Sequence, residues 1–217
     1  MMEVLEQYLH KMCIRDSACT VSCKDWNQVK SGLVRWRKHV GHEKTNEGYD
    51  VTTRTSILQN VENLVMSCNH CDRPACVKAC SSNAISKDAN TGIVSIDREK
   101  CIGVLACITA CPFGAIGIAD DYQEPEKQGG WQISHPAQKC NMCIDRVNDG
   151  QEPVCVASCV GRAIHWGPID ELKRDYPAAV TINKNKFPYA YQNDNEDTGP
   201  SFLIIPRNPL NIIFKTH

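Results

Sequence analysis

The grouping of its cysteines constrains this chain more than any other feature. Fourteen cysteines occur in 217 residues, and they cluster instead of being scattered between loops. Cysteines at such density form disulfides, bind zinc or hold iron–sulfur clusters, and their spacing has to decide among these. The four groups are Cys13, Cys19 and Cys23; Cys68, Cys71, Cys76 and Cys80; Cys101, Cys107 and Cys111; and Cys140, Cys143, Cys155 and Cys159.

The second group has a spacing that serves two metal centres. Cys68, Cys71 and Cys76 lie on one tight loop, and a short helix that begins near Pro74 turns Cys80 away from them. In two-cluster ferredoxins, the fourth cysteine of such a run ligates the other cluster. The second group therefore requires a partner run.

The segment after Cys80 predicts a β-hairpin that supplies this partner. Apolar runs at 84–87 and 93–97 flank a turn-rich stretch of Asp, Asn and Gly, which is the pattern of a hairpin. The hairpin leads directly to the third group and brings it beside the second. The two-cluster pattern then pairs Cys68, Cys71 and Cys76 with Cys111, and Cys101 and Cys107 with Cys80.

The outer groups are expected to repeat this crossed arrangement, with Cys140, Cys143 and Cys155 joined by Cys23, and Cys13 and Cys19 joined by Cys159. The predicted fold is α+β, with two nested ferredoxin-like dicluster modules built from short helices, β-hairpins and long loops. The four-cluster domain covers 13–176, with an inner module at about 66–119 and an outer module from 13–40 and 131–167.

An internal repeat supports this organisation. Cys80, Cys111 and Cys159 each begin a C-x-x-x-A-I sequence. Repetition of one supersecondary unit explains the three copies better than chance does. Each copy predicts a turn after the cysteine and then the start of an apolar strand.

In the first and third groups, a residue other than cysteine stands at the second position of a C-x2-C-x2-C-x3-C pattern. Val104 occupies the second position of the third group, and Asp16 occupies that of the first. Carboxylate oxygen can bind iron, although it is a harder ligand than thiolate, so Asp16 is either an iron ligand or a solvated loop residue. The run Lys11 to Ser17 also resembles translated sequencing-adaptor sequence, so we expect 1–12 to be undefined or artefactual.

The remaining segments give weaker signals. Residues 34–40 alternate like a strand, 57–65 fit a strand or a short helix, and Pro168 opens a predicted helix over 169–174. The polar stretch 120–130 predicts a surface loop. Beyond Pro177, residues 177–217 read as an extended arm lying on something else, not as a second core.

Charge and hydropathy exclude several classes of protein. The 24 basic and 25 acidic residues nearly balance, which gives no electrostatic footprint for nucleic acid. No run of about 18 apolar residues predicts a membrane span, and no export signal is evident. Lys78 and Lys100 stand beside cysteines, where they either raise the potential of a neighbouring centre or are simply solvated.

Soft thiolates in groups of three plus one favour iron–sulfur clusters over harder metals. Taken alone, the fourth group also suits a tetrahedral zinc site in a structural module, and zinc remains the alternative. Thiolates that ligate iron are not available as nucleophiles, so the cysteines predict electron transfer and no catalysis of their own.

The order of the groups, the sequence Ser67 to Cys71 and the long loop before Cys155 resemble the four-cluster β subunit of DMSO-reductase-type molybdoenzymes. The run Gly167 to Leu172 also fits that family. The resemblance covers about 13–176. It implies a non-catalytic subunit that relays electrons between a membrane quinol-reactive subunit and a molybdopterin catalytic subunit, with membrane association through these partners on an undetermined face. The alternative is the iron–sulfur subunit of a formate dehydrogenase or hydrogenase complex.

In that family, a residue other than cysteine at the position of Val104, as in respiratory nitrate reductase, accompanies a 3Fe-4S cluster. The resemblance therefore implies one 3Fe-4S cluster, at Cys80, Cys101 and Cys107, and three 4Fe-4S clusters. Proline commonly follows the last cysteine of a group, and here it does so only at Pro112, because Ser81 and Val160 replace it elsewhere.

Overall fold

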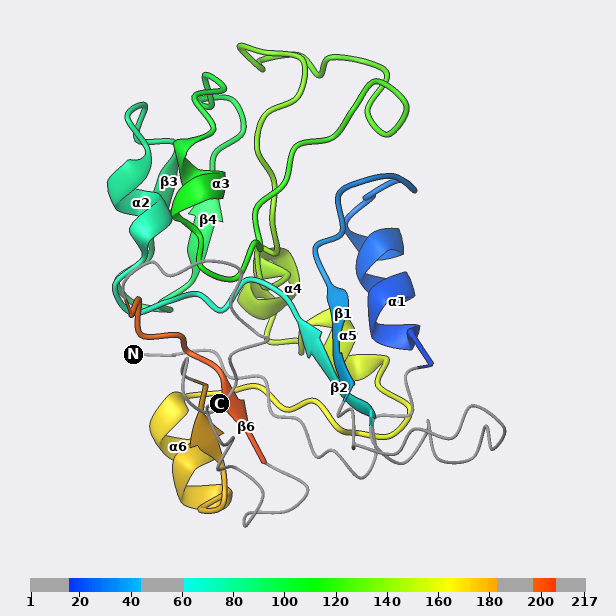
Figure 1. The fold of residues 1–217 in the computed structure, drawn as a ribbon, viewed down its shortest axis with the longest axis vertical. Coiled ribbons are helices and arrows are strands. Elements are labelled where there is room, and N and C mark those ends of the chain that lie inside the picture. Colours follow the sequence, from blue (N-terminus) through cyan, green and yellow to red (C-terminus); the bar gives the residue numbers. More distant parts are fainter. Residues whose placement is uncertain (1–15, 44–60, 183–196, 206–217) are drawn as a thin grey trace.

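The computed structural model describes residues 16–43, 61–182 and 197–205. Their helices are short, and their strands form two-stranded antiparallel sheets (Figure 1). The helices are α1 (Ala18–Trp26), α2 (Ala75–Ala79), α3 (Ala106–Ala110), α4 (Ile144–Asn148), α5 (Val154–Ala157) and α6 (Ile169–Asp175). The strands are β1 (Lys38–Glu43), β2 (Val61–Met66), β3 (Ile85–Lys87), β4 (Val94–Ile96), β5 (Val180–Thr181) and β6 (Leu203–Ile204).

The predicted hairpin after Cys80 is confirmed. β3 pairs antiparallel with β4, with Ile85 opposite Ile96 and Lys87 opposite Val94. The Asp88 carboxylate accepts hydrogen bonds from the backbone N–H groups of Asn90 and Thr91, at 2.9 and 2.7 Å, which closes the turn. The hairpin lies beside α2 and α3, and the three elements form one end of the molecule (Figure 1).

The strand predicted at 34–40 begins later than expected, at Lys38, and pairs with β2. Gln123 explains the shift, because its side-chain amide takes over the hydrogen bonds of Val34. Its Oε1 accepts from the Val34 N–H at 2.9 Å, and its Nε2 donates to the Val34 carbonyl at 3.0 Å. A Cβ at Gly32 would lie 2.7 Å from this amide, so the close approach requires glycine.

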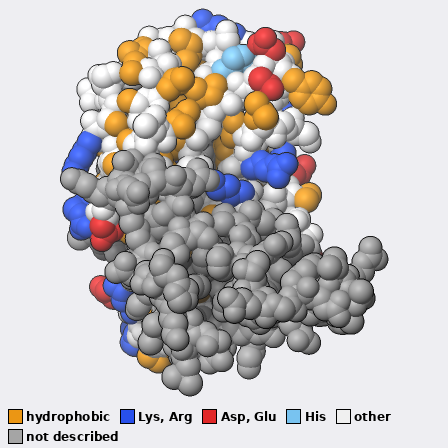
Figure 2. All heavy atoms as spheres, in the orientation of Figure 1, with side chains coloured by type: hydrophobic (Ala, Val, Ile, Leu, Met, Phe, Trp, Pro, Cys, Tyr) orange, Lys and Arg blue, Asp and Glu red, His pale blue; other side chains and the backbone are white. Residues whose placement is uncertain are grey.

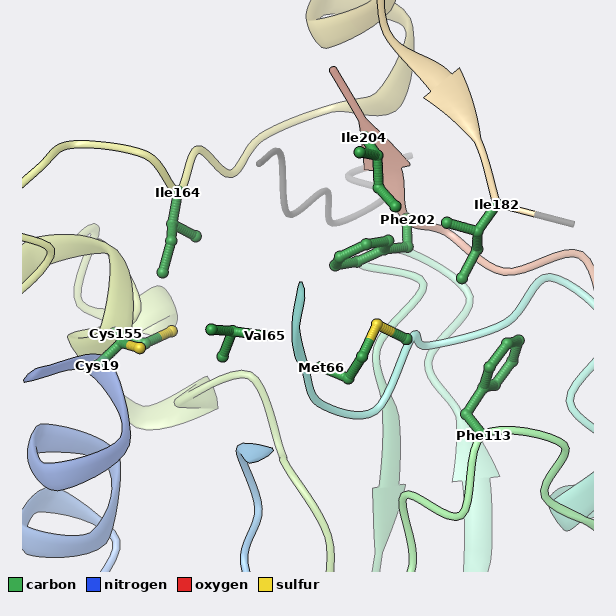
Figure 3. Close-up of a cluster of buried hydrophobic side chains, with 9 residues drawn as sticks. All are labelled: Cys19, Val65, Met66, Phe113, Cys155, Ile164, Ile182, Phe202 and Ile204. Carbon is green, nitrogen blue, oxygen red and sulfur yellow. The ribbon is translucent and has the colours of Figure 1, made fainter. Parts of the chain in front are cut away.

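A buried cluster joins segments that are far apart in the sequence. Val65 of β2 points toward Cys19 and Cys155, and Met66 points toward two phenylalanines (Figure 3). The helices α1 and α5 pack together in this region, where the Ser22 and Ser158 hydroxyls lie 2.6 Å apart. The cluster consists of Cys19, Val65, Met66, Phe113, Cys155, Ile164, Ile182, Phe202 and Ile204.

The C-terminal region contains one predicted helix and a strand pair that the sequence does not predict. The helix after Pro168 is present as α6, and β5 pairs with β6. The described part of the segment predicted as an extended arm consists of 177–182 and 197–205. Its Phe202 is 1% exposed and packs in the main core, so the described part of the arm belongs to the core.

Candidate metal centres

The loop after β2, the start of α2 and the chain after α3 bring four cysteines around one recess, which we call the inner buried recess. Cys68, Cys71, Cys76 and Cys111 line it, and it encloses about 340 Å³ of space that is partly open to solvent. Burial raises the pKa of Cys71 and of Cys76 to about 12, and the negative charges of neighbouring thiolates add to the shift. Such thiols become ligands only when a cationic centre compensates their charge.

Lys139 lines this recess, and Lys38 and His70 are hydrogen-bonded to segments beside it. Lys139 is 3% exposed, and its ammonium donates to the carbonyls of Val94 and Cys140. The Lys38 ammonium donates to the Gly114 carbonyl at 3.0 Å, and burial lowers its pKa although the Cys111 thiolate acts in the opposite direction. His70 is 1% exposed, and its Nδ1 accepts from the Val94 N–H at 2.9 Å.

A second set of cysteines lies at the α2–α3 end, around what we call the inner open recess. Cys80, Cys101 and Cys107 line it, and it encloses about 390 Å³, part of it solvent. Burial, followed by the neighbouring thiolates, raises the pKa of Cys107. Burial also acts against the Cys80 thiolate, but hydrogen bonds from Ser82, Ile85 and Ala84 outweigh it, so the pKa of Cys80 is lowered.

Val104 lines the open recess at the predicted position of the absent cysteine. Its side chain is 58% exposed, and the neighbouring Ile102 and Leu105 are 46% and 45% exposed. Leu105 has a positive φ of 65° immediately before α3. The loop that would supply a fourth thiolate therefore presents an apolar surface instead.

The C-x-x-x-A-I repeat has a clear structural basis. After each cysteine, the third residue has a left-handed backbone, with φ of 53° at Asn83, 54° at Gly114 and 47° at Arg162. This turn directs the alanine N–H back toward the cysteine. Ala115 donates to Cys111 Sγ at 3.4 Å, Ala163 donates to Cys159 Sγ at 3.1 Å, and Ala84 contributes to lowering the pKa of Cys80. The repeat thus places an N–H donor on each of these sulfurs.

The outer groups also approach one another. The Asn27 amide, at the end of α1, lies 3.7 Å from Cys23 Sγ and 3.8 Å from Cys143 Sγ. Met142 N–H donates to Cys140 Sγ at 3.4 Å. Cys19 and Cys155 lie together in the buried cluster (Figure 3), and Cys159 packs against that cluster.

Two predicted site residues, Cys13 and Asp16, are not seen among the grouped cysteines. Cys13 lies outside the described residues. Asp16 is exposed, and its Oδ1 accepts a hydrogen bond from the Ala18 N–H at 3.0 Å. This contact engages the carboxylate at the start of α1, which favours the loop interpretation of Asp16 over the ligand interpretation.

The two lysines that the sequence suggested as modulators of a neighbouring centre, Lys78 and Lys100, are solvated. Lys78 is exposed, and Lys100 is exposed and pairs with Asp97 at 2.8 Å. Among the described residues, Lys38 and Lys139 act on the thiolates, and the sequence predicts this role for neither. The position of Lys139 directly before Cys140 was the one available signal.

The donor sets fit iron–sulfur clusters. Several soft thiolates surround each recess, and backbone N–H groups donate to several of the sulfurs, as is typical of cluster sites. No disulfide links the cysteines that the structure describes. Within the same residues, no three His, Cys, Asp or Glu side chains are arranged to bind a single metal ion.

Comparisons with known proteins agree with this geometry. The family described as 4Fe-4S dicluster domain matches residues 60–169. The chain is 42% identical to the B subunit of anaerobic dimethyl sulfoxide reductase of Escherichia coli over 76% of this chain and 73% of that protein. It is 34% identical to the thiosulfate reductase electron transfer subunit PhsB of Salmonella typhi over 74% of this chain and 73% of that one. It is also 34% identical to the nitrate-inducible formate dehydrogenase iron-sulfur subunit of Escherichia coli, over 74% and 52%.

Proposed function

Because the chain belongs to the 4Fe-4S dicluster family, we propose that it relays electrons through a row of iron–sulfur clusters to or from a molybdopterin catalytic subunit. The observation that carries this proposal is the convergence of cysteines from distant groups on shared recesses, such as Cys68 with Cys111. A row of clusters transfers electrons because each cluster accepts charge with little rearrangement, while burial and hydrogen bonds set its potential. The substrate chemistry belongs to the partner, and this subunit is not catalytic.

The ligand sets that we propose follow the crossed pattern. In the inner module, the shared recesses support them directly. In the outer module, the contacts of Asn27 with Cys23 and Cys143 support the pairing of the first group with the fourth. The sets are Cys68, Cys71, Cys76 and Cys111; Cys80, Cys101 and Cys107; Cys23, Cys140, Cys143 and Cys155; and Cys13, Cys19 and Cys159.

We assign a 3Fe-4S cluster to the open recess. Valine has no atom that can ligate iron, and Val104 stands where a fourth thiolate would be needed. Three thiolates suffice for a cluster that lacks one iron. The other three sets are assigned 4Fe-4S clusters.

The partners are a molybdopterin-containing catalytic subunit and a quinol-reactive membrane subunit. No described helix has the length and apolarity needed to cross a bilayer, and we place the chain at the membrane through its partners. The exposed apolar side chains of Ile102, Val104 and Leu105 support a docking face at the open recess, because apolar patches mark interaction sites. Figure 2 shows hydrophobic side chains exposed in the upper part of the molecule, where Figure 1 places α2 and α3.

A second candidate is the iron–sulfur subunit of a formate dehydrogenase complex, and the similarity to such a subunit favours it. The cluster arrangement is common to both functions, since the substrate chemistry lies on the catalytic partner. Copurification of the chain with its natural partner, followed by assays with formate and with dimethyl sulfoxide, distinguishes the two.

Iron and sulfide analysis tests the proposal itself. A chain purified under anaerobic conditions should hold about 15 irons, from three 4Fe-4S clusters and one 3Fe-4S cluster. A 3Fe-4S cluster is paramagnetic when oxidised, so the oxidised protein should give a low-temperature EPR signal. Stoichiometric zinc without sulfide would show instead that the chain is a zinc-binding module.

A further inference from the structure

The C-terminal arm is hydrogen-bonded along the loop that carries Cys71. The N–H of Arg73 donates to the Thr198 carbonyl at 2.9 Å, and the N–H of Asp72 donates to the Gly199 carbonyl at 2.6 Å. Farther along, the Ser201 N–H donates to the Asn69 carbonyl at 3.0 Å. The two segments therefore run in opposite directions, and the arm is held in register with the ligand loop.

This register places one hydroxyl on a ligand sulfur. Thr198 Oγ1 donates to Cys71 Sγ at 3.1 Å, across 127 positions of sequence. The Thr198 residue is 3% exposed and lines the buried recess beside the cysteines. Because Thr198 is almost fully buried there, the hydroxyl dipole acts on the sulfur with less screening than at an exposed site.

The open recess has a different kind of hydroxyl donor. Ser82 lies two residues from Cys80, and its Oγ is 3.6 Å from Cys80 Sγ. That contact is local and longer, on a loop that carries its own ligand. The contact of Thr198 depends on the docking of a separate segment that begins far beyond the last cysteine.

We propose that Thr198 is a positioning residue that raises the reduction potential of the cluster held by Cys71, so that docking of the arm tunes this step of the relay. The inference rests on the proposed function, since it needs a cluster at Cys68, Cys71, Cys76 and Cys111. When this cluster takes one electron from a neighbouring cluster, its thiolates become more negative. A hydroxyl that donates to one of them stabilises the reduced form, as hydrogen bonds to cluster sulfurs do in general.

The test is an EPR-monitored redox titration of the cluster-loaded chain in its complex. Thr198→Val keeps the shape of the side chain and removes the hydroxyl. At a fixed potential near the midpoint, we expect the ratio of oxidised to reduced cluster to rise about three- to tenfold, and a tenfold change corresponds to about 59 mV for one electron. The other clusters should keep their potentials.

Two further variants separate the hydroxyl from the docking of the arm. Thr198→Ser retains the hydroxyl and should keep the wild-type potential. Ser201→Ala removes a hydroxyl of the same arm that donates to the His70 carbonyl at 3.1 Å and to no sulfur. A shift in Ser201→Ala equal to that in Thr198→Val would overturn the proposal, because loosening of the arm would then explain both.

Each remaining outcome is also decisive. If Thr198→Val loads clusters but keeps the wild-type potential, the tuning role is wrong. If Thr198→Val does not assemble the cluster, Thr198→Ala is tested in its place. If neither Thr198 variant assembles the cluster while Ser201→Ala does, the tuning role is wrong and Thr198 has a structural role instead. Absence of iron and sulfide from the wild-type chain itself would instead refute the proposed function.

Discussion

The two inner recesses share one cysteine pattern but differ in how they are built. The buried recess has four cysteines, a lysine ammonium that is almost fully enclosed and a threonine from a remote arm. The open recess has three cysteines, Val104 in place of the fourth and an exposed apolar rim. The difference teaches that the cysteine pattern, including its gap at Val104, fixes the ligands of each site, whereas the surroundings of each recess set the electrostatic environment of those ligands.

The largest expected effect comes from removing a ligand at the buried recess. Cys71→Ala leaves three thiols at this recess, and burial raises the pKa of two of them, Cys76 and Cys111, so we expect loss of the whole 4Fe-4S cluster. Iron should fall from about 15 to about 11 per chain, measured by metal analysis after anaerobic purification. Val104→Ala at the open recess is the control and should leave the iron content unchanged. An equal loss in both variants would mean that Val104 is needed for assembly.

The second prediction reverses the difference in cluster type. Val104→Cys supplies the absent thiolate, so the open recess should gain about one iron and become a 4Fe-4S site. Low-temperature EPR of the oxidised protein should lose the 3Fe-4S signal. Val104→Ala should keep it. Persistence of the signal in the cysteine variant would show that the loop holds this position too far from the cluster.

The third prediction compares a buried lysine, Lys139, with an exposed one, Lys100. Lys139→Met removes a buried positive charge that acts on the Cys76 and Cys111 thiolates. A unit charge at about 8 Å with an effective dielectric constant near 20 contributes about 2 kcal/mol, so the potential of the buried cluster should fall. Redox titration measures the shift. Lys100→Met, which removes an exposed charge, should change no potential detectably, because solvent and salt screen it. Equal shifts in the two variants would contradict the distinction.

The smallest effect is expected on thermal stability, from a substitution that disturbs the contact between the C-terminal arm and the loop that carries Cys71. Gly199 has φ of +60°, and a Cβ there would lie 3.1 Å from Asp72 Cβ. Gly150 has a similar φ of +71° but nothing within 4 Å. Both alanine variants bear the backbone cost of about 1–2 kcal/mol, and only Gly199→Ala adds crowding against the ligand loop. The temperature at which iron–sulfur absorbance is lost should therefore fall further for Gly199→Ala, and equal losses would argue against tight docking.

Much of the local structure follows from the sequence because the signals are local. The hairpin after Cys80 is present because a Gly- and Asp-rich turn separates two apolar runs, and α6 begins where Pro168 fixes the backbone. The C-x-x-x-A-I repeat was also visible, although its physical meaning was not. Only the backbone shows that the residue before each alanine is left-handed, which directs an N–H to the sulfur.

Long-range contacts could not be read from the sequence. The side-chain amide of Gln123, 89 positions away, hydrogen-bonds the backbone of Val34 in the way that a neighbouring strand would. Lys78 lies two positions from Cys76 and from Cys80, and Lys100 directly precedes Cys101, but both lysine side chains are exposed and solvated. Burial distinguishes these lysines from Lys139, and burial is a property of the packed chain.

The sequence by itself determined the chemistry: soft thiolates at fixed short spacings select iron–sulfur clusters, and Val104 removes one ligand whatever the fold. The tertiary structure alone decided the environment of each site. It brought the Thr198 hydroxyl to Cys71 and enclosed Lys139 beside the same recess. The physical reason is the distance along the sequence over which each property is set. The spacing of ligands within a group is set by a few neighbouring residues, whereas the electrostatic environment of a sulfur depends on which distant segments pack against it.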